Sequence, residues 1–105
     1  MSMDDAATSV DGVAIRLTDE RWQHIVDRHP EMKDARSDVL ETIRNPDRVQ
    51  RGDDGAKLAI RFFEGTSVSD KHLVVIYREN GEDGFAITAY YATDPAVWRE
   101  TLWTR

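Results

Sequence analysis

One early stretch of the chain, residues 18–31, combines a helical hydrophobic pattern with two of the three histidines. Thr18 is a good N-cap, and the acidic residues that follow it suit the start of a helix. An apolar stripe recurs at positions i, i+3, i+4 and i+7, and should face the core. It consists of Trp22, Ile25, Val26 and His29. Because Pro30 disfavours helical backbone in the residue before it, the pattern predicts a helix from about Asp19 to His29.

Shorter runs of alternating or apolar residues predict the other elements. A strand is expected at 12–17, and a second helix follows a Ser37 cap and ends at Asn45-Pro46. Further strands are expected at 47–51, 57–63, 72–78 and 84–93, with turns at 52–55 and 80–84 and a polar loop at 64–71. Residues 1–11 are expected to be a disordered acidic tail, and a C-terminal arm or short helix starts at about 95.

This order of elements predicts one α+β domain over 12–105. We expect the N-terminal strand and two helices to pack on one face of a roughly four-stranded antiparallel sheet, with the other face open. Alternation along the strands then assigns side chains to the two faces. The core face receives Leu58, Ile60, Phe62, Phe85, Ile87, Ala89 and Tyr91. The open face receives Lys57, Arg61, Phe63, Thr88 and Tyr90. The strand at 72–78 is apolar on both sides, so Tyr77 is assigned either to the core or to a site.

Composition narrows the class of protein. The 105 residues carry a net charge of −6 and no cysteine, which leaves neither a disulfide nor a thiolate nucleophile. Residues 21–61 form the basic part, with nine bases against eight acids. An excess of Arg over Lys and of Asp over Glu is typical of a halophile-like, salt-adapted surface, although an ordinary acidic cytosolic protein explains it equally well. Without a signal sequence or long apolar run, we expect a cytoplasmic protein that does not enter a membrane.

The predicted open face suits a polyanion, and RNA in particular. Arg61 can bind a phosphate through two N–H groups, Lys57 adds a positive charge, and Phe63 or Tyr90 offers a surface for base stacking. RNA also carries its own nucleophile, the 2′-hydroxyl, so cleavage needs only proton transfer and charge stabilisation. His24 and His29 can transfer protons, but their i, i+5 spacing separates the rings, so no metal site and no cofactor are expected.

Several segments together resemble a known family. They read Leu-Thr-Asp-Glu-Arg-Trp-Gln-His-Ile-Val-Asp-Arg-His-Pro-Glu, Glu-Thr-Ile-Arg-Asn-Pro-Asp-Arg-Val, Arg-Phe-Phe, Leu-Val-Val-Ile-Tyr and Ile-Thr-Ala-Tyr. Over residues 15–93 they resemble the phage-associated branch of the barnase, EndoU, colicin E5/D and RelE-like (BECR) nuclease superfamily. The resemblance implies a helix pair on a four-stranded antiparallel sheet and a metal-independent, toxin-like or mobile-element-associated ribonuclease. The catalytic positions that it implies are Arg28, His29, Arg61, Thr88 and Tyr90.

The sequence therefore supports a leading hypothesis and two alternatives. The first is an endoribonuclease whose catalytic residues are His29, Arg28, Arg61, Thr88 and Tyr90. Its substrate-binding residues are His24, Lys57, Phe63 and Tyr77, and an antitoxin or immunity protein is a candidate partner. The second is a non-catalytic interaction domain that binds protein or nucleic acid, and the third is a homodimer joined through Trp98, Leu102 and Trp103.

One geometric difficulty stands: His29 faces the helix-covered side of the sheet, whereas Arg61, Thr88 and Tyr90 are assigned to the open side. They can meet only if the helix end reaches around the sheet edge or if a strand assignment is off by one residue.

Overall fold

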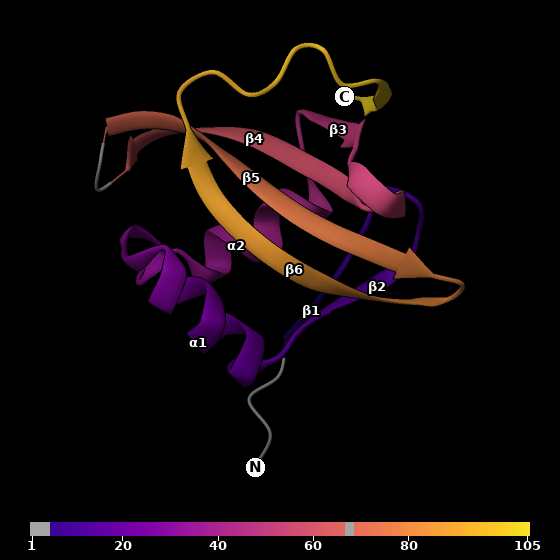
Figure 1. The fold of residues 1–105 in the computed structure, drawn as a ribbon, viewed down its shortest axis with the longest axis horizontal. Helices are drawn as coiled ribbons and strands as arrows, with labels where there is room; N and C mark the ends of the chain where they lie inside the picture. The colour runs from indigo at the N-terminus through magenta and orange to yellow at the C-terminus, as the bar shows by residue number, and fades with distance from the viewer. Residues whose placement is uncertain (1–4, 67–68) are drawn as a thin grey trace.

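The chain is built on a mixed, strongly curved sheet, seen in a computed structural model that describes residues 5–66 and 69–105 (Figure 1). The strands are β1 (Asp5–Thr8), β2 (Ala14–Leu17), β3 (Arg48–Arg51), β4 (Lys57–Thr66), β5 (Ser69–Asn80), β6 (Asp83–Ala92) and β7 (Thr101–Thr104). The helices are α1 (Asp19–Arg28) and α2 (Arg36–Arg44), with 3-10 turns η1 (Pro30–Met32) and η2 (Asp53–Gly55). The strand order is β1-β2-β6-β5-β4-β3-β7, and β2 runs parallel to β6.

The predicted four-stranded antiparallel sheet is wrong. The described residues form a seven-stranded mixed sheet, in which the N-terminal strand β2 is a member rather than a packed layer. Residues 5–8, predicted to be disordered, form β1 and pair with β2, while residues 1–4 of the predicted tail lie outside the described residues. The predicted loop at 64–71 is largely strand, because β4 continues to Thr66 and β5 begins at Ser69. Residues from 95 onward form no helix in the structure but end in β7, which pairs with β3.

The first helix forms as its sequence predicts, and the second begins earlier. The Thr18 hydroxyl accepts a hydrogen bond from the Arg21 N–H at 3.0 Å, and α1 ends at its C-cap, His29. The prediction that Ser37 caps α2 is wrong, because the N-cap is Ala35, which makes no side-chain capping bond. Of the apolar stripe on α1, only Ile25 is buried completely. Within the described ranges no helix has the length and apolar character needed to cross a membrane.

Buried side chains lie on both faces of the sheet. We call the side that packs against α2 the inner face, where Ala59, Leu73, Val75 and Tyr77 join the larger cluster. Leu58, Ile60 and Val74 form a second cluster on the opposite, outer face. The assignment of β4 is therefore reversed: Ala59 and Phe63 belong to the inner face, and Leu58 and Ile60 to the outer. The alternation of side chains along β4 could not show which face lies toward the helices, because both faces of this strand are covered.

A β-bulge changes the assignment along β6. Ile76 pairs with Thr88 but Tyr77 pairs with Ala86, so Ile87 is an extra residue in β6. Ala86 and Ala89 consequently both lie in the inner cluster, although regular alternation would place them on opposite faces. The prediction that Phe85 belongs to the core is wrong, since its side chain is exposed. Beyond the bulge, Tyr90 lies on the outer face as predicted.

The outer face is not open along its whole length. The segment after β6 runs back toward β3 (yellow in Figure 1), and residues 94–99 share a cavity with Leu58, Ile60 and Val74. Several hydrogen bonds attach this segment to β3, and two of them involve Gln50 and the backbone of Arg51. The Gln50 side-chain amide donates to the Ala96 carbonyl at 2.7 Å, and the Arg51 N–H donates to the Glu100 carbonyl at 2.8 Å.

Candidate active site

A pocket lies between α1 and the bulged part of β6. β2 pairs with β6 only at residues 83–85, and α1 lies beside the following part of β6 (Figure 1). The pocket has a volume of about 340 Å³, and we call it the α1–β6 pocket. Its lining residues are Arg21, His24, Ile25, Arg28, His29, Ile87 and Thr88. Two imidazoles, two guanidiniums and a hydroxyl therefore converge on one concavity in an otherwise acidic protein.

His29 reaches from the end of α1 to a side chain of the outer face. The His29 and Tyr90 rings have centroids 5.9 Å apart, with an interplanar angle of 34°. His29 is able to do so because it is the C-cap, where the chain leaves the helix in an extended direction (φ −131°, ψ 77°). The predicted difficulty is thus resolved for this pair: the helix end reaches around the sheet edge.

A carboxylate also lies close to the His29 ring. The Glu31 Oε1 atom is 3.9 Å from His29 Nδ1, a distance too long for a hydrogen bond but close enough for a charge interaction. That oxygen is buried and has no hydrogen-bond partner. Glu31 is therefore the carboxylate that the structure places beside the His29 ring.

The bulge in β6 brings backbone and side-chain groups into the pocket. The Arg21 guanidinium donates to the Ile87 carbonyl at 3.5 Å, which connects the first turns of α1 to the bulge. A regular strand would direct neighbouring side chains to opposite faces, but Ile87 and Thr88 both line the pocket. Bulges recur near active sites for this reason, since they redirect side chains.

Arg61 lies in a different pocket, at the end of α2. The Asn45 carbonyl accepts hydrogen bonds from Arg61 Nη1 at 2.6 Å and from Arg105 Nη2 at 2.8 Å. This second pocket of about 530 Å³ is also lined by Glu41, Arg44, Trp103 and Val10. Cations at a helix C-terminus satisfy its carbonyl groups and interact favourably with its dipole. The structure therefore gives Arg61 a helix-capping contact and does not bring it to His29.

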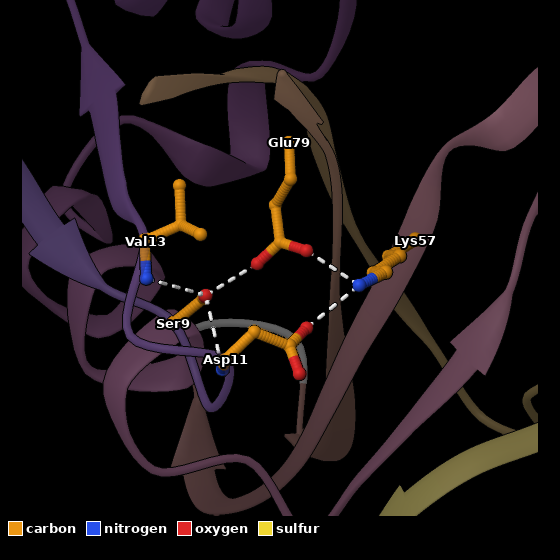
Figure 2. A network of polar contacts seen from close by, with 5 residues as sticks. All are labelled: Ser9, Asp11, Val13, Lys57 and Glu79. Atoms are coloured by element: carbon orange, nitrogen blue, oxygen red, sulfur yellow. Dashed lines mark hydrogen bonds and ion pairs between the residues drawn. The ribbon is translucent and has the colours of Figure 1, made fainter. Parts of the chain in front are cut away.

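Lys57 belongs to a polar network at the opposite end of β4. Its ammonium group contacts Glu79 and donates to Asp11 at 2.6 Å (Figure 2). The Ser9 hydroxyl donates to the other Glu79 oxygen at 2.5 Å and accepts from the backbone N–H groups of Asp11 and Val13. The network joins the β1–β2 turn to β4 and β5, so the structure gives Lys57 two carboxylate partners and does not bring it to the α1–β6 pocket.

This network also contributes to three shifted pKa values at that end of the sheet, those of Lys57, Asp11 and Tyr77. Burial alone would lower the pKa of Lys57, but its bonds to Asp11 and Glu79 raise it overall. The hydrogen bond from Lys57 lowers the pKa of Asp11. Burial, followed by the negative charges of Glu79 and Asp11, raises the pKa of Tyr77.

The last two predicted substrate contacts, Tyr77 and Phe63, are buried and partly buried, respectively, at the inner cluster. Tyr77 is 1% exposed and lies in the inner cluster, so it is a core residue. Phe63 is partly buried against the same cluster, and its ring centroid is 5.6 Å from the Arg61 guanidinium carbon. Of the nine predicted site residues, five lie at or beside the α1–β6 pocket. These are His24, Arg28, His29, Thr88 and Tyr90.

Two further residues of the site were absent from the sequence-based prediction. Arg21 precedes His24 by three positions and Arg28 by seven, which places all three on one helix side. Glu31 stands in the same His-Pro-Glu segment as His29, where only the histidine was singled out. Both signals are readable in the sequence.

No three histidine, aspartate or glutamate side chains in the described part of the chain come together as metal ligands would. Comparison of the chain with protein-family models, with curated proteins and with solved structures gave no significant match.

Proposed function

We propose that this protein is a cytoplasmic, metal-independent endoribonuclease whose active site is the α1–β6 pocket. One observation carries the proposal: His24, Arg28, His29 and Thr88 line a single concavity, with Tyr90 beside His29. The resemblance of the His-Pro-Glu and neighbouring segments to BECR nucleases points to the same chemistry.

The lining residues provide what RNA cleavage by its own 2′-hydroxyl requires. A base removes the 2′-hydroxyl proton, the 2′ oxygen bonds to phosphorus, and the bond from phosphorus to the 5′ oxygen breaks. A protonated group then supplies a proton to the departing 5′ oxygen, which leaves a 2′,3′-cyclic phosphate and a 5′-hydroxyl end. We assign His29 and His24 to the two proton transfers, with His29 as the principal one because Glu31 is beside it.

The positive groups stabilise the charge that develops on phosphorus. Arg28 and Arg21 line the same pocket and can donate several N–H groups to the non-bridging oxygens. Thr88 can donate one further hydrogen bond, and Tyr90 orients the His29 ring or stacks on a base. Arg61 has no place in this scheme, since the Asn45 carbonyl occupies it.

The proposal is tested by incubating purified protein with total RNA in the presence of a metal chelator. We expect fragments with 2′,3′-cyclic phosphate ends, and His29→Ala should slow their formation by about 10²- to 10⁴-fold. Gln23→Ala, on the same helix and exposed, is the matched control. Intact RNA, or equal cleavage by parent and His29→Ala, would falsify the proposal.

A toxin-like role follows if this activity is unchecked in cells. Induced expression of the parent protein should then arrest growth, while His29→Ala should not. An antitoxin or immunity protein is the expected partner, because a cell that keeps such an enzyme must restrain it.

A non-catalytic interaction domain is the second candidate, and exposed apolar side chains favour it. Val97 and Trp98 are 90% and 75% exposed, and every residue of the edge strand β7 is exposed. Unpaired sheet edges beside apolar side chains are common binding surfaces for another chain. If this candidate is correct, growth is unaffected by expression, and light scattering that rises with concentration would identify the partner as a second copy.

A further inference from the structure

A second cavity lies on the outer face, one side chain away from the proposed active site. It measures about 200 Å³ and is enclosed between the outer cluster of the sheet and residues 94–99. Tyr90 lines this cavity, and its ring centroid lies 5.9 Å from that of His29, which lines the α1–β6 pocket, so this pair of rings stands between the two concavities.

The lining of this cavity is apolar apart from a few groups at defined places. Leu58, Ile60 and Val74 form its floor, and Ala92 and Ala96 also line it. A volume of 200 Å³ is below the roughly 300–1,000 Å³ of pockets that hold drug-sized ligands, so the cavity suits a single planar ring. The indole of Trp98 stands at the same cavity and is largely exposed.

Gln50 supplies a hydrogen-bond acceptor with no partner. Its side chain is only 2% exposed and lines the cavity, and its Nε2 group donates to the Ala96 carbonyl. That bond fixes the orientation of the amide and leaves Oε1 buried without a partner. A buried acceptor of this kind costs folding free energy unless a ligand supplies an N–H group.

The charges around the cavity favour a donor-bearing ring over a phosphate. The Arg99 guanidinium is already held by Asp53 at 3.2 Å and by the Arg51 carbonyl at 3.3 Å. Asp94 adds a carboxylate to the lining. Gln50 and Asp94 both line the cavity, and each carries an acceptor to which the amino group of a ligand could donate.

We propose that this cavity binds an unpaired, amino-bearing nucleobase of the RNA, next to the phosphate that is cleaved, and that Gln50 recognises its amino group. The proposal rests on the proposed function for the identity of the ligand. It adds a base-specificity site, and it makes Gln50 a specificity-determining residue rather than a catalytic one.

Cytidine and uridine are matched probes of the same size, since cytosine has a 4-amino group beside an unprotonated N3, whereas uracil has a 4-oxo group beside an N3–H. We would titrate each into ¹⁵N-labelled full-length protein and follow the Gln50 side-chain amide and the Trp98 indole by NMR. Cytidine should shift both signals and bind at least several-fold more tightly than uridine. Absence of a cytidine shift at Gln50, or equal binding of the two nucleosides, would overturn the proposal.

Two variants separate cavity binding from a general effect on folding. Ala92→Leu should fill the cavity and weaken cytidine binding at least tenfold, while Ala14→Leu, at an exposed strand position, should leave it unchanged. Gln50→Met should remove the preference for cytidine over uridine. Unchanged cytidine binding by Ala92→Leu would place the nucleoside elsewhere and reject the proposal.

The readout does not depend on catalysis, so the two proposals fail separately. Cytidine binding without any RNA cleavage would reject the endoribonuclease and keep the base site. RNA cleavage by a protein that binds no nucleoside in this cavity would reject the base site and keep the endoribonuclease.

Discussion

At the scale of single residues, Glu31 is the carboxylate neighbour of His29, and its contribution to the proposed cleavage can be tested. The carboxylate oxygen nearest His29 Nδ1 is buried and has no hydrogen-bond partner, so its interaction with the ring is electrostatic. A partly exposed ion pair contributes up to about 1 kcal/mol, which corresponds to about fivefold in rate. We therefore expect Glu31→Gln to slow RNA cleavage about fivefold without changing the affinity for RNA.

The control for Glu31 is Glu82→Gln, which removes the same charge from the exposed turn between β5 and β6. Initial cleavage rates and RNA binding should be measured for both variants. If Glu31→Gln and Glu82→Gln cleave at the same rate, Glu31 only packs against the end of α1.

Lys57 is a residue whose substitution should lower the free energy of unfolding. Its ammonium group neutralises Glu79, whose side chain is only 12% exposed, and bonds to Asp11 as well (Figure 2). Breaking a buried ion pair costs about 3–5 kcal/mol, and partial exposure of Lys57 reduces this to about 2–3 kcal/mol. Urea denaturation should show that loss in the free energy of unfolding of Lys57→Met.

Lys33→Met provides the comparison, since Lys33 is exposed and a surface substitution changes stability by about 0.5 kcal/mol or less. The double variant Lys57→Met/Glu79→Gln should recover part of the loss, because it removes the uncompensated buried charge. Equal stability of the two single lysine variants would show that the network contributes nothing.

Helix caps give a prediction at the scale of elements. Thr18 accepts the Arg21 N–H, whereas Ser37 lies inside α2 and was only predicted to cap it. Thr18→Ala should therefore lower the free energy of unfolding by about 1 kcal/mol. Ser37→Ala should change it by no more than a few tenths, in the stabilising direction, because Ala is the better helix former.

Thermal unfolding of the two variants checks this contrast. A larger loss for Ser37→Ala than for Thr18→Ala would mean that α2 begins at Ser37 after all.

The sequence predicted elements well where a local signal determines them. Both ends of α1 follow from Thr18 and Pro30, which act within one helical turn. The bulge at Ile87 carries no such signal, since an extra residue leaves the local alternation pattern intact on either side. Its consequence is large, because it puts Thr88 in the α1–β6 pocket and moves Phe85 out of the core.

At the scale of the whole molecule, the errors concern which segments meet. The pairing of β2 with β6 and of β7 with β3 joins residues far apart in the sequence, and no local pattern specifies such partners. The covering of the outer face by residues 94–99 is likewise a long-range contact. Because this segment covers the outer face, both faces of β4 are apolar. Alternation alone therefore placed Arg61 on the face away from the helices, which is the wrong face.

The polar network between the β1–β2 turn, β4 and β5 makes the stability of the whole molecule depend on pH at both extremes. The pKa of Asp11 is lowered below 3.8, so its contribution is present above that pH and is lost as the pH falls through the folded-state pKa. The pKa of Lys57 is raised above 10.5, so its contribution is present below that pH and is lost as the pH rises through the folded-state pKa.

The difference in unfolding free energy between the parent protein and Lys57→Met isolates this effect from the other titrating groups. It should be constant near neutral pH, and should shrink both below pH 3.8 and above pH 10.5, because one partner of the network then loses its charge. Urea denaturation of both proteins over that range measures it, with Lys33→Met as the variant whose difference should stay near zero throughout. A Lys57→Met difference that does not change at either extreme would show that hydrogen bonding and packing, rather than charge, hold the β1–β2 turn to the sheet.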